Sequence, residues 1–155
     1  MATPTMLQRL LKAASDIGFW RGFGRLHAAV YRATDGLVGG SAGRLTNLLL
    51  TTTGRKSGER RTVPLAYVAD GERFVVVASN GGADRHPAWW LNLLANPRAT
   101  VQVRHLTVDV TAREATPVEH TRLWPHLKSV NPFFAQYERM TGRRIPVVVL
   151  ERVRR

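Results

Sequence analysis

From residue 45 onward the chain is dominated by short segments rich in apolar and β-branched residues, separated by turn-forming residues. Segments of this kind are typical of β-strands. Asp70-Gly71 lies between two of them and is typical of a hairpin turn. Consecutive strands joined by hairpins favour antiparallel pairing, which indicates a small closed or split barrel rather than a parallel sheet. The six expected strands are Leu45 to Thr53, Thr62 to Ala69, Phe74 to Ser79, Ala99 to Arg104, Thr107 to Ala112 and Ile145 to Val153.

Three helical segments accompany the expected strands. Pro87 opens the stretch PAWWLNLLANP, which has proline at the first helical position and a stop at Asn96-Pro97. Thr116 and Glu119 have the spacing of a capping box, so a helix should run from there toward Lys128. A further helical turn or two is expected over residues 132–140. The predicted fold class is therefore mainly β with helices (α+β), with one helix in a crossover and others at the ends.

The first 43 residues have a different pattern. Apolar residues recur at helical spacing from Leu7 and again from Phe19 to Val30, which predicts two amphipathic helices. Residues 35–43 form a glycine-rich connector. We expect one domain overall, with helices and connector at 1–43 and the barrel at 44–155. Trp20-Arg21 next to one helical stripe allows contact with an anionic membrane, as an alternative to packing on the chain's own barrel.

Charge is the strongest feature of the composition. Lysine and arginine total 23 against 11 acidic residues, a formal net charge of +12, which attracts polyanions. Nucleic acid, anionic lipid and a polyanionic cofactor all remain open on this basis. The chain has no cysteine, which excludes disulfides and thiol chemistry, and no apolar stretch long enough to span a bilayer. Because Gln8, Arg9 and Lys12 interrupt the first apolar segment, we expect a cytoplasmic protein without a signal peptide.

Three familiar patterns are excluded by their context or spacing. The stretch GGSAG at residues 39–43 matches the serine-hydrolase elbow, but a helix precedes it and a strand follows, the reverse of what that elbow requires. The five histidines lack the spacing of a zinc site, so no metal is expected. The stretch TTTGRKSG lacks the first glycine of a nucleotide-binding P-loop and re-enters a strand instead of a helix.

A basic hairpin tip is the remaining interpretation of TTTGRKSG. It brings Arg55, Lys56, Arg60 and Arg61 together, with Glu59 as the nearby acid. Arginine forks and a lysine point charge on one turn can hold a phosphate by charge-assisted hydrogen bonds. A solvated basic turn without a ligand is the alternative.

The stretches TTTGRKSG, ASNGG and PAWWLNLLANP, in that order, resemble the deazaflavin-dependent nitroreductase family, actinobacterial split-barrel reductases that use coenzyme F420. The likeness runs from about residue 44 to the C-terminal IPVVVLERV. It implies a split barrel like those of flavin reductases and FMN-binding proteins. The resemblance also implies a cofactor made of a deazaflavin ring joined through ribitol and a phosphate to a lactyl and oligoglutamate tail.

The resemblance assigns binding roles to residues of this chain. Basic residues of the hairpin tip would hold the phosphate and tail. The following strand would lie along the ring and bond its polar edge through main-chain groups, and the glycines after the next strand would approach the cofactor closely. Two residues three apart on the short helix would close the pocket. In chain order these residues are Arg55, Lys56, Arg61, Val63, Pro64, Leu65, Ala66, Ala78, Ser79, Asn80, Gly81, Gly82, Trp89 and Asn92.

The implied reaction is hydride transfer from the reduced deazaflavin to a quinone, or to an activated nitro compound or enone. Phe134 and Tyr137 would contact this acceptor, and Ser79 and Tyr137 would orient or protonate it. By this resemblance Asn131, Phe134 and Ala66 occupy positions where relatives often carry tyrosine, which leaves the acceptor open. An FMN-dependent split barrel is an alternative, and a non-specific basic nucleic-acid-binding domain is an alternative from another class. We expect a monomer or a homodimer.

Overall fold

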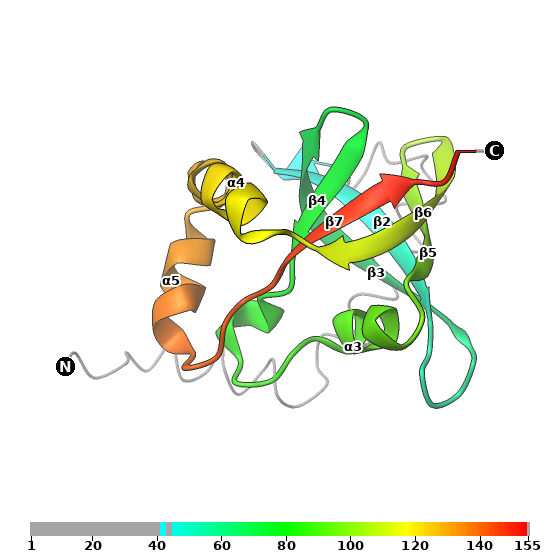
Figure 1. The fold of residues 1–155 in the computed structure, drawn as a ribbon, viewed down its shortest axis with the longest axis horizontal. Coiled ribbons are helices and arrows are strands. Elements are labelled where there is room, and N and C mark those ends of the chain that lie inside the picture. The colour runs from blue at the N-terminus through cyan, green and yellow to red at the C-terminus, as the bar shows by residue number, and fades with distance from the viewer. Residues whose placement is uncertain (1–40, 43–44, 155) are drawn as a thin grey trace.

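The structure, a computed structural model, describes residues 41–42 and 45–154. Both expected N-terminal helices lie outside the described residues. The described part forms one antiparallel sheet with three α-helices and a short 3-10 helix (Figure 1). The elements are β1 Ser41–Ala42, β2 Leu45–Thr53, β3 Arg60–Asp70, β4 Arg73–Val77, η1 Asn80–Gly82, α3 Ala88–Ala95, β5 Arg98–Val103, β6 Leu106–Glu114, α4 Pro117–Val130, α5 Phe133–Met140 and β7 Val147–Arg152.

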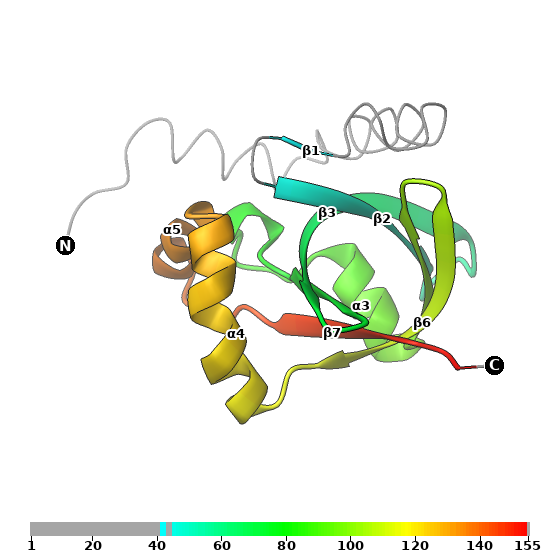
Figure 2. The same ribbon diagram turned by 90° about the horizontal axis from the view of Figure 1, so that it is seen from above.

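Six of the strands close into a barrel. Their order is β2-β3-β4-β7-β6-β5, and β5 returns to pair with β2, with Leu50 opposite Val101. Every pairing is antiparallel. Figure 2 looks through this ring of strands onto α3, which lies across one end. The predicted mainly β fold with a six-stranded barrel is confirmed.

Several element boundaries differ from the predictions by one or two residues. Ser41–Ala42, near the end of the predicted connector of residues 35–43, form β1 and pair with the start of β2, so they belong to the sheet. β4 ends at Val77 instead of Ser79, because the chain turns there into η1. Strand β7 begins at Val147, two residues later than expected, because Pro146 cannot donate a hydrogen bond to a ladder.

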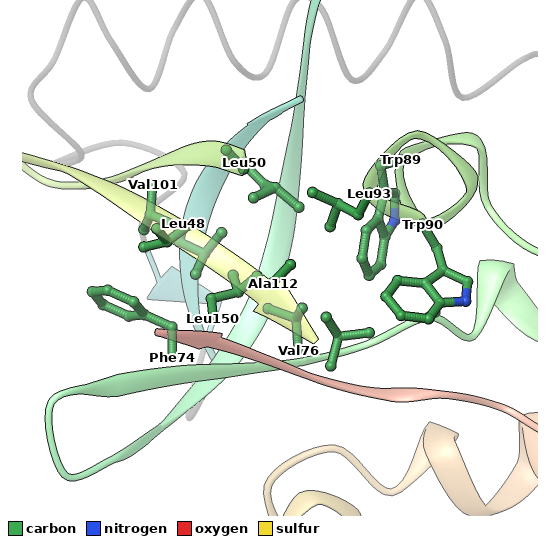
Figure 3. Packing of buried hydrophobic residues seen from close by; sticks show 14 residues of the cluster. Leu48, Leu50, Phe74, Val76, Trp89, Trp90, Leu93, Val101, Ala112 and Leu150 are labelled. Atoms are coloured by element: carbon green, nitrogen blue, oxygen red, sulfur yellow. The ribbon is translucent and has the colours of Figure 1, made fainter. Parts of the chain in front are cut away.

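The first hydrophobic core fills the barrel. Alternate residues of the strands point inward, as in Phe74 and Val76 of β4. Trp89, Trp90 and Leu93 of α3 enter this core from one end of the barrel (Figure 3). Helix α3 therefore covers one end of the barrel, and its apolar face completes the hydrophobic core inside it.

A second core lies outside the barrel under α4 and α5. It takes the opposite faces of the same strands, including Val75 of β4 and Val147 of β7. Helix α4 begins with the predicted capping box, in which the Thr116 hydroxyl accepts from the Glu119 amide at 3.2 Å and the Glu119 carboxylate accepts from the Thr116 amide at 2.9 Å. Among the described residues no helix is long and apolar enough to cross a membrane.

Candidate functional site

The N-terminal half of β3 has an open edge. Residues 60–67 pair with β2 along their whole length, from Arg60 opposite Thr53 to Tyr67 opposite Thr46. Pairing with β4 covers only residues 68–70. In an antiparallel strand alternate residues direct their N–H and C=O groups to opposite sides, so part of this main chain faces away from β2 with no strand of the described residues beside it. The barrel is therefore split along residues 60–67 and stays closed through the pairing of residues 68–70 with β4.

The residues predicted to line the ring lie on that open segment. Val63, Pro64, Leu65 and Ala66 are all half-buried, between the exposed hairpin tip and the buried Val68. Pro64 suits an edge because proline lacks the N–H that an inner strand needs. The expected main-chain ligands therefore lie on the segment of β3 whose outer edge pairs with no strand among the described residues.

The turn between β2 and β3 carries the predicted cations. Arg55, Lys56 and Arg61 are exposed there, and the Arg61 guanidinium lies 2.6 Å from the Glu59 carboxylate. Gly58 takes a left-handed φ of 70°, and its amide donates to the Gly54 carbonyl at 2.8 Å. Among the described residues Lys56 has no acidic partner within ion-pair distance. Three cationic side chains therefore gather at this turn, and one of them is paired with Glu59.

Asn92 of α3 fastens this turn to the barrel. Its Oδ1 accepts from the Arg55 main-chain N–H at 3.1 Å and from the Arg55 Nη1 at 3.2 Å. Its Nδ2 donates to Oγ1 of the fully buried Thr52 at 3.1 Å. Asn92 itself is 4% exposed. Its contacts in this structure therefore orient Arg55, and the predicted contact with the cofactor stays a prediction.

The segment after β4 is the next predicted part of the site. Asn80, Gly81 and Gly82 have φ angles of 48°, 62° and 79°, three left-handed residues in succession. A Cβ on Gly82 would lie 3.3 Å from the Met140 Cβ and from the Tyr137 Cα, so the close approach seen here is to α5. Ala78 and Ser79, just before this turn, are buried.

Arg143 holds this segment and was not predicted. It precedes β7, and its guanidinium donates from Nε to the Ala83 carbonyl at 2.9 Å and from Nη2 to the Ser79 carbonyl at 2.9 Å. The same Nη2 donates to the Ala78 carbonyl at 3.3 Å. More than fifty residues separate the arginine from these carbonyls, and no sequence motif marks it, so sequence alone offered no signal.

Ser79 and Tyr137, the predicted proton-handling pair, lie on neighbouring elements. Ser79 is the residue before η1, and α5, which carries Tyr137, packs on η1. Tyr137 is half-buried, and burial raises the pKa of its phenol above the ordinary value near 10. A tyrosine hydroxyl is protonated at neutral pH in any case and can donate a hydrogen bond, and the raised pKa makes loss of its proton less favourable.

Two predicted aromatic site residues, besides Ala78, are buried in the cores. Trp89 is 6% exposed and meets Trp90 edge to face inside the barrel end. Phe134 is 7% exposed and stacks on Trp124, with ring centroids 6.2 Å apart. Helical spacing cannot tell a core-facing aromatic from a pocket-facing one, which is why both were candidates. Their contacts here are packing contacts, and a role beside cofactor or acceptor stays a prediction.

Comparison with known proteins gives a consistent result. The profile of the F420H(2)-dependent quinone reductase family matches residues 23–152. An F420H(2)-dependent quinone reductase of Mycobacterium tuberculosis is 42% identical over 132 residues, which cover 83% of this chain and 89% of that protein.

Solved structures agree with the sequence comparison. An F420H2-dependent reductase is 40% identical, with a TM-score of 0.63 over 68% of this chain and 93% of that one. A domain-swapped dimer is 35% identical, with a TM-score of 0.65 over 82% of this chain and 95% of that one. The split barrel, its basic turn and these likenesses together show that the chain belongs to the F420H(2)-dependent quinone reductase family.

Proposed function

We propose that this protein is an F420H2-dependent oxidoreductase that reduces a quinone or a similar planar acceptor. Family membership supports the reaction and the cofactor. The structural observation that carries the proposal is the edge of β3 that directly follows a cationic turn and pairs with no other strand in the part of the chain that the structure describes. Such an edge offers hydrogen bonds to a heterocycle, and the turn offers charge to a phosphate and a carboxylate tail. The residues present therefore fit this cofactor.

In this proposal each part of the site has one task. Lys56 and Arg61 hold the phosphate and tail, together with Arg55, which Asn92 keeps in place. The main chain of residues 63–66 binds the polar edge of the ring. The segment 78–82 borders the ring from the end of β4.

The bound deazaflavin supplies the hydride, and the protein supplies position, exclusion of water and a proton. Tyr137 is a candidate donor to the acceptor because a tyrosine phenol is protonated at neutral pH. Burial raises its pKa, which favours donation of a hydrogen bond over loss of the proton. Ser79 is the second candidate to orient the acceptor. Nitro compounds and enones are further acceptors to test, since Asn131 and Phe134 differ from the tyrosines that are common in relatives.

The alternatives lose support from the same observations. An FMN-dependent split barrel shares the fold, but the family profile, the Mycobacterium tuberculosis relative and the solved reductase described above all name F420. A nucleic-acid-binding role rested on net charge alone, and part of that charge is now placed at the β2–β3 turn. Fluorescence titration with F420 and FMN side by side separates the two cofactors.

The decisive test removes the turn cations. Lys56→Ala combined with Arg61→Ala should weaken F420 binding at least about tenfold, because two charge-assisted contacts to the phosphate and tail are lost. Fluorescence titration of free F420 into purified protein measures this affinity. Lys128→Ala combined with Arg154→Ala removes the same charge elsewhere and should leave the affinity within about twofold. An unchanged affinity in the first double variant would refute the assigned site.

The cellular location and the oligomeric state of the protein are also proposals. We propose a cytoplasmic enzyme, with contact between the N-terminal segment and an anionic membrane surface as a prediction that vesicle co-sedimentation tests. A monomer or homodimer remains the expected assembly, and one structural relative is a domain-swapped dimer. Light scattering during gel filtration measures the assembly of this chain directly.

A further inference from the structure

The segment from Ala78 to Ala83 adopts a backbone conformation that needs support. Three consecutive residues are left-handed, and the first of them, Asn80, is not glycine. Non-glycine residues in that region cost free energy, and such conformations persist only where the surroundings enforce them. Within the segment, the Gly82 amide donates to the Ser79 carbonyl at 2.9 Å and the Ala83 amide to the Asn80 carbonyl at 3.2 Å. These local bonds close the turn but do not fix it to the barrel.

Arg143 provides a side-chain attachment, beside the main-chain bond in which the Ala78 N–H donates to the Pro146 carbonyl at 2.9 Å. Three carbonyls of the segment, those of Ala78, Ser79 and Ala83, accept hydrogen bonds from its guanidinium. Ala78 and Ala83 are fully buried and Ser79 is 8% exposed, so water is a poor substitute for these donors. The planar fork of arginine reaches several acceptors at fixed angles, which a lysine ammonium cannot do.

Neighbouring groups hold Arg143 in turn. Its main-chain N–H donates to Oγ1 of the buried Thr141 at 3.3 Å, and that hydroxyl donates to the Asp84 carboxylate at 3.3 Å. Nη1 donates to Nδ1 of His86 at 3.2 Å. Burial, followed by the charges of Arg143 and Arg144, lowers the pKa of His86, so its ring is neutral and its Nδ1 can accept. Residues before β7 therefore bond to both ends of the segment between β4 and α3, at Ala78 and at His86.

We propose that Arg143 is a positioning residue for the cofactor site: it holds residues 78–83 in the conformation that borders the deazaflavin ring. The inference rests on the proposed function, because it assigns the purpose of the attachment to cofactor binding. It adds a residue that acts through three main-chain carbonyls and lies outside the basic turn and the open strand.

Arg143→Lys tests this role, because it keeps the positive charge and removes the planar guanidinium that reaches the three carbonyls. F420 affinity is expected to fall at least about tenfold. In the protein without cofactor, the amides of Gly82 and Ala83 are expected to exchange with deuterium faster than in the wild type, since their turn is no longer anchored. Arg144→Lys is the matched control, because Arg144 is the exposed neighbour and pairs with Glu114. The F420 affinity of this control variant and its amide exchange at Gly82 and Ala83 should equal those of the wild type.

Thr141→Val covers the case in which Arg143→Lys does not fold. It removes the hydroxyl that accepts from Arg143 while keeping the side-chain shape, and should weaken F420 binding about threefold with faster exchange at the same amides.

The outcomes separate the inference from the proposed function. Wild-type protein that binds F420, with a folded variant of equal affinity, overturns the inference and leaves the function standing, even if the melting temperature falls. Wild-type protein that binds no F420 overturns both. Weaker binding with faster exchange at residues 82–83 supports the positioning role.

Discussion

At the scale of single residues, the basic turn depends on Asn92. One amide side chain satisfies the Arg55 N–H, the Arg55 guanidinium and the buried Thr52 hydroxyl at once. Asn92→Leu has similar volume and removes all three bonds. It should lower the free energy of unfolding by about 1–3 kcal/mol, because buried polar groups lose their partners. Chemical denaturation measures this change.

The same variant distinguishes two roles for Asn92. If Asn92 acts by orienting Arg55, then Asn92→Leu and Arg55→Ala should weaken F420 binding by amounts that do not add in the double variant. Additive losses would instead indicate a separate contact between Asn92 and the cofactor. Asn96→Ala, at the exposed end of the same helix, is the control and should bind F420 like the wild type.

At the scale of elements, an ion-pair network joins α4 to the barrel. Glu119 accepts from Arg113 at 2.7 Å and from Arg73 at 3.1 Å, and Asp70 accepts from Arg122 at 2.8 Å. The Arg122 hydrogen bond is the main cause that lowers the pKa of Asp70 from 3.8 to about 2. The Arg113 hydrogen bond holds the pKa of Glu119 well below its usual value. The network therefore favours the charged carboxylates in the folded state.

The sign of the pH dependence follows from these shifts. A carboxylate whose folded pKa is depressed stabilises the protein above its unfolded pKa, near 4, and that stability is lost as the pH falls toward 2. Glu119→Gln keeps a capping-box side chain but no charge, and should cost about 1 kcal/mol at pH 7. Its stability should then fall less steeply than that of the wild type between pH 4.5 and 2.

Urea unfolding over this pH range measures the difference. Glu72→Gln, at the exposed β3–β4 turn, removes an equal charge and should retain the wild-type slope. Equal slopes for Glu119→Gln and wild type would contradict the assigned role of the network.

Some elements of the fold are determined by residues that are close in the sequence, and others by contacts between distant residues. Strands, the Asp70-Gly71 turn and the capping box at Thr116 were predictable, because each depends on residues within a few positions of one another. The closure of β5 onto β2 was expected only as a barrel in general, since its register depends on contacts between Leu50 and Val101, far apart in the sequence. η1 was missed because its left-handed residues require a distant anchor.

At the scale of the whole molecule, the same distinction applies to the site. The basic turn and the strand after it are contiguous in sequence, so their roles could be proposed before the fold was known. Arg143 and Thr141 reach the segment after β4 only in the folded barrel. Trp89 and Phe134 share helical faces with other apolar residues, and only the fold shows that both contribute to cores.

The central claim is that one cofactor spans the cationic turn and the open edge of β3. A crystal structure of the protein with bound F420 tests it most directly. We predict the phosphate within hydrogen-bonding distance of Lys56 or Arg61, and the polar edge of the ring bonded to main-chain groups of residues 63–66. Cofactor bound elsewhere on the barrel, with this edge unoccupied, would contradict the account.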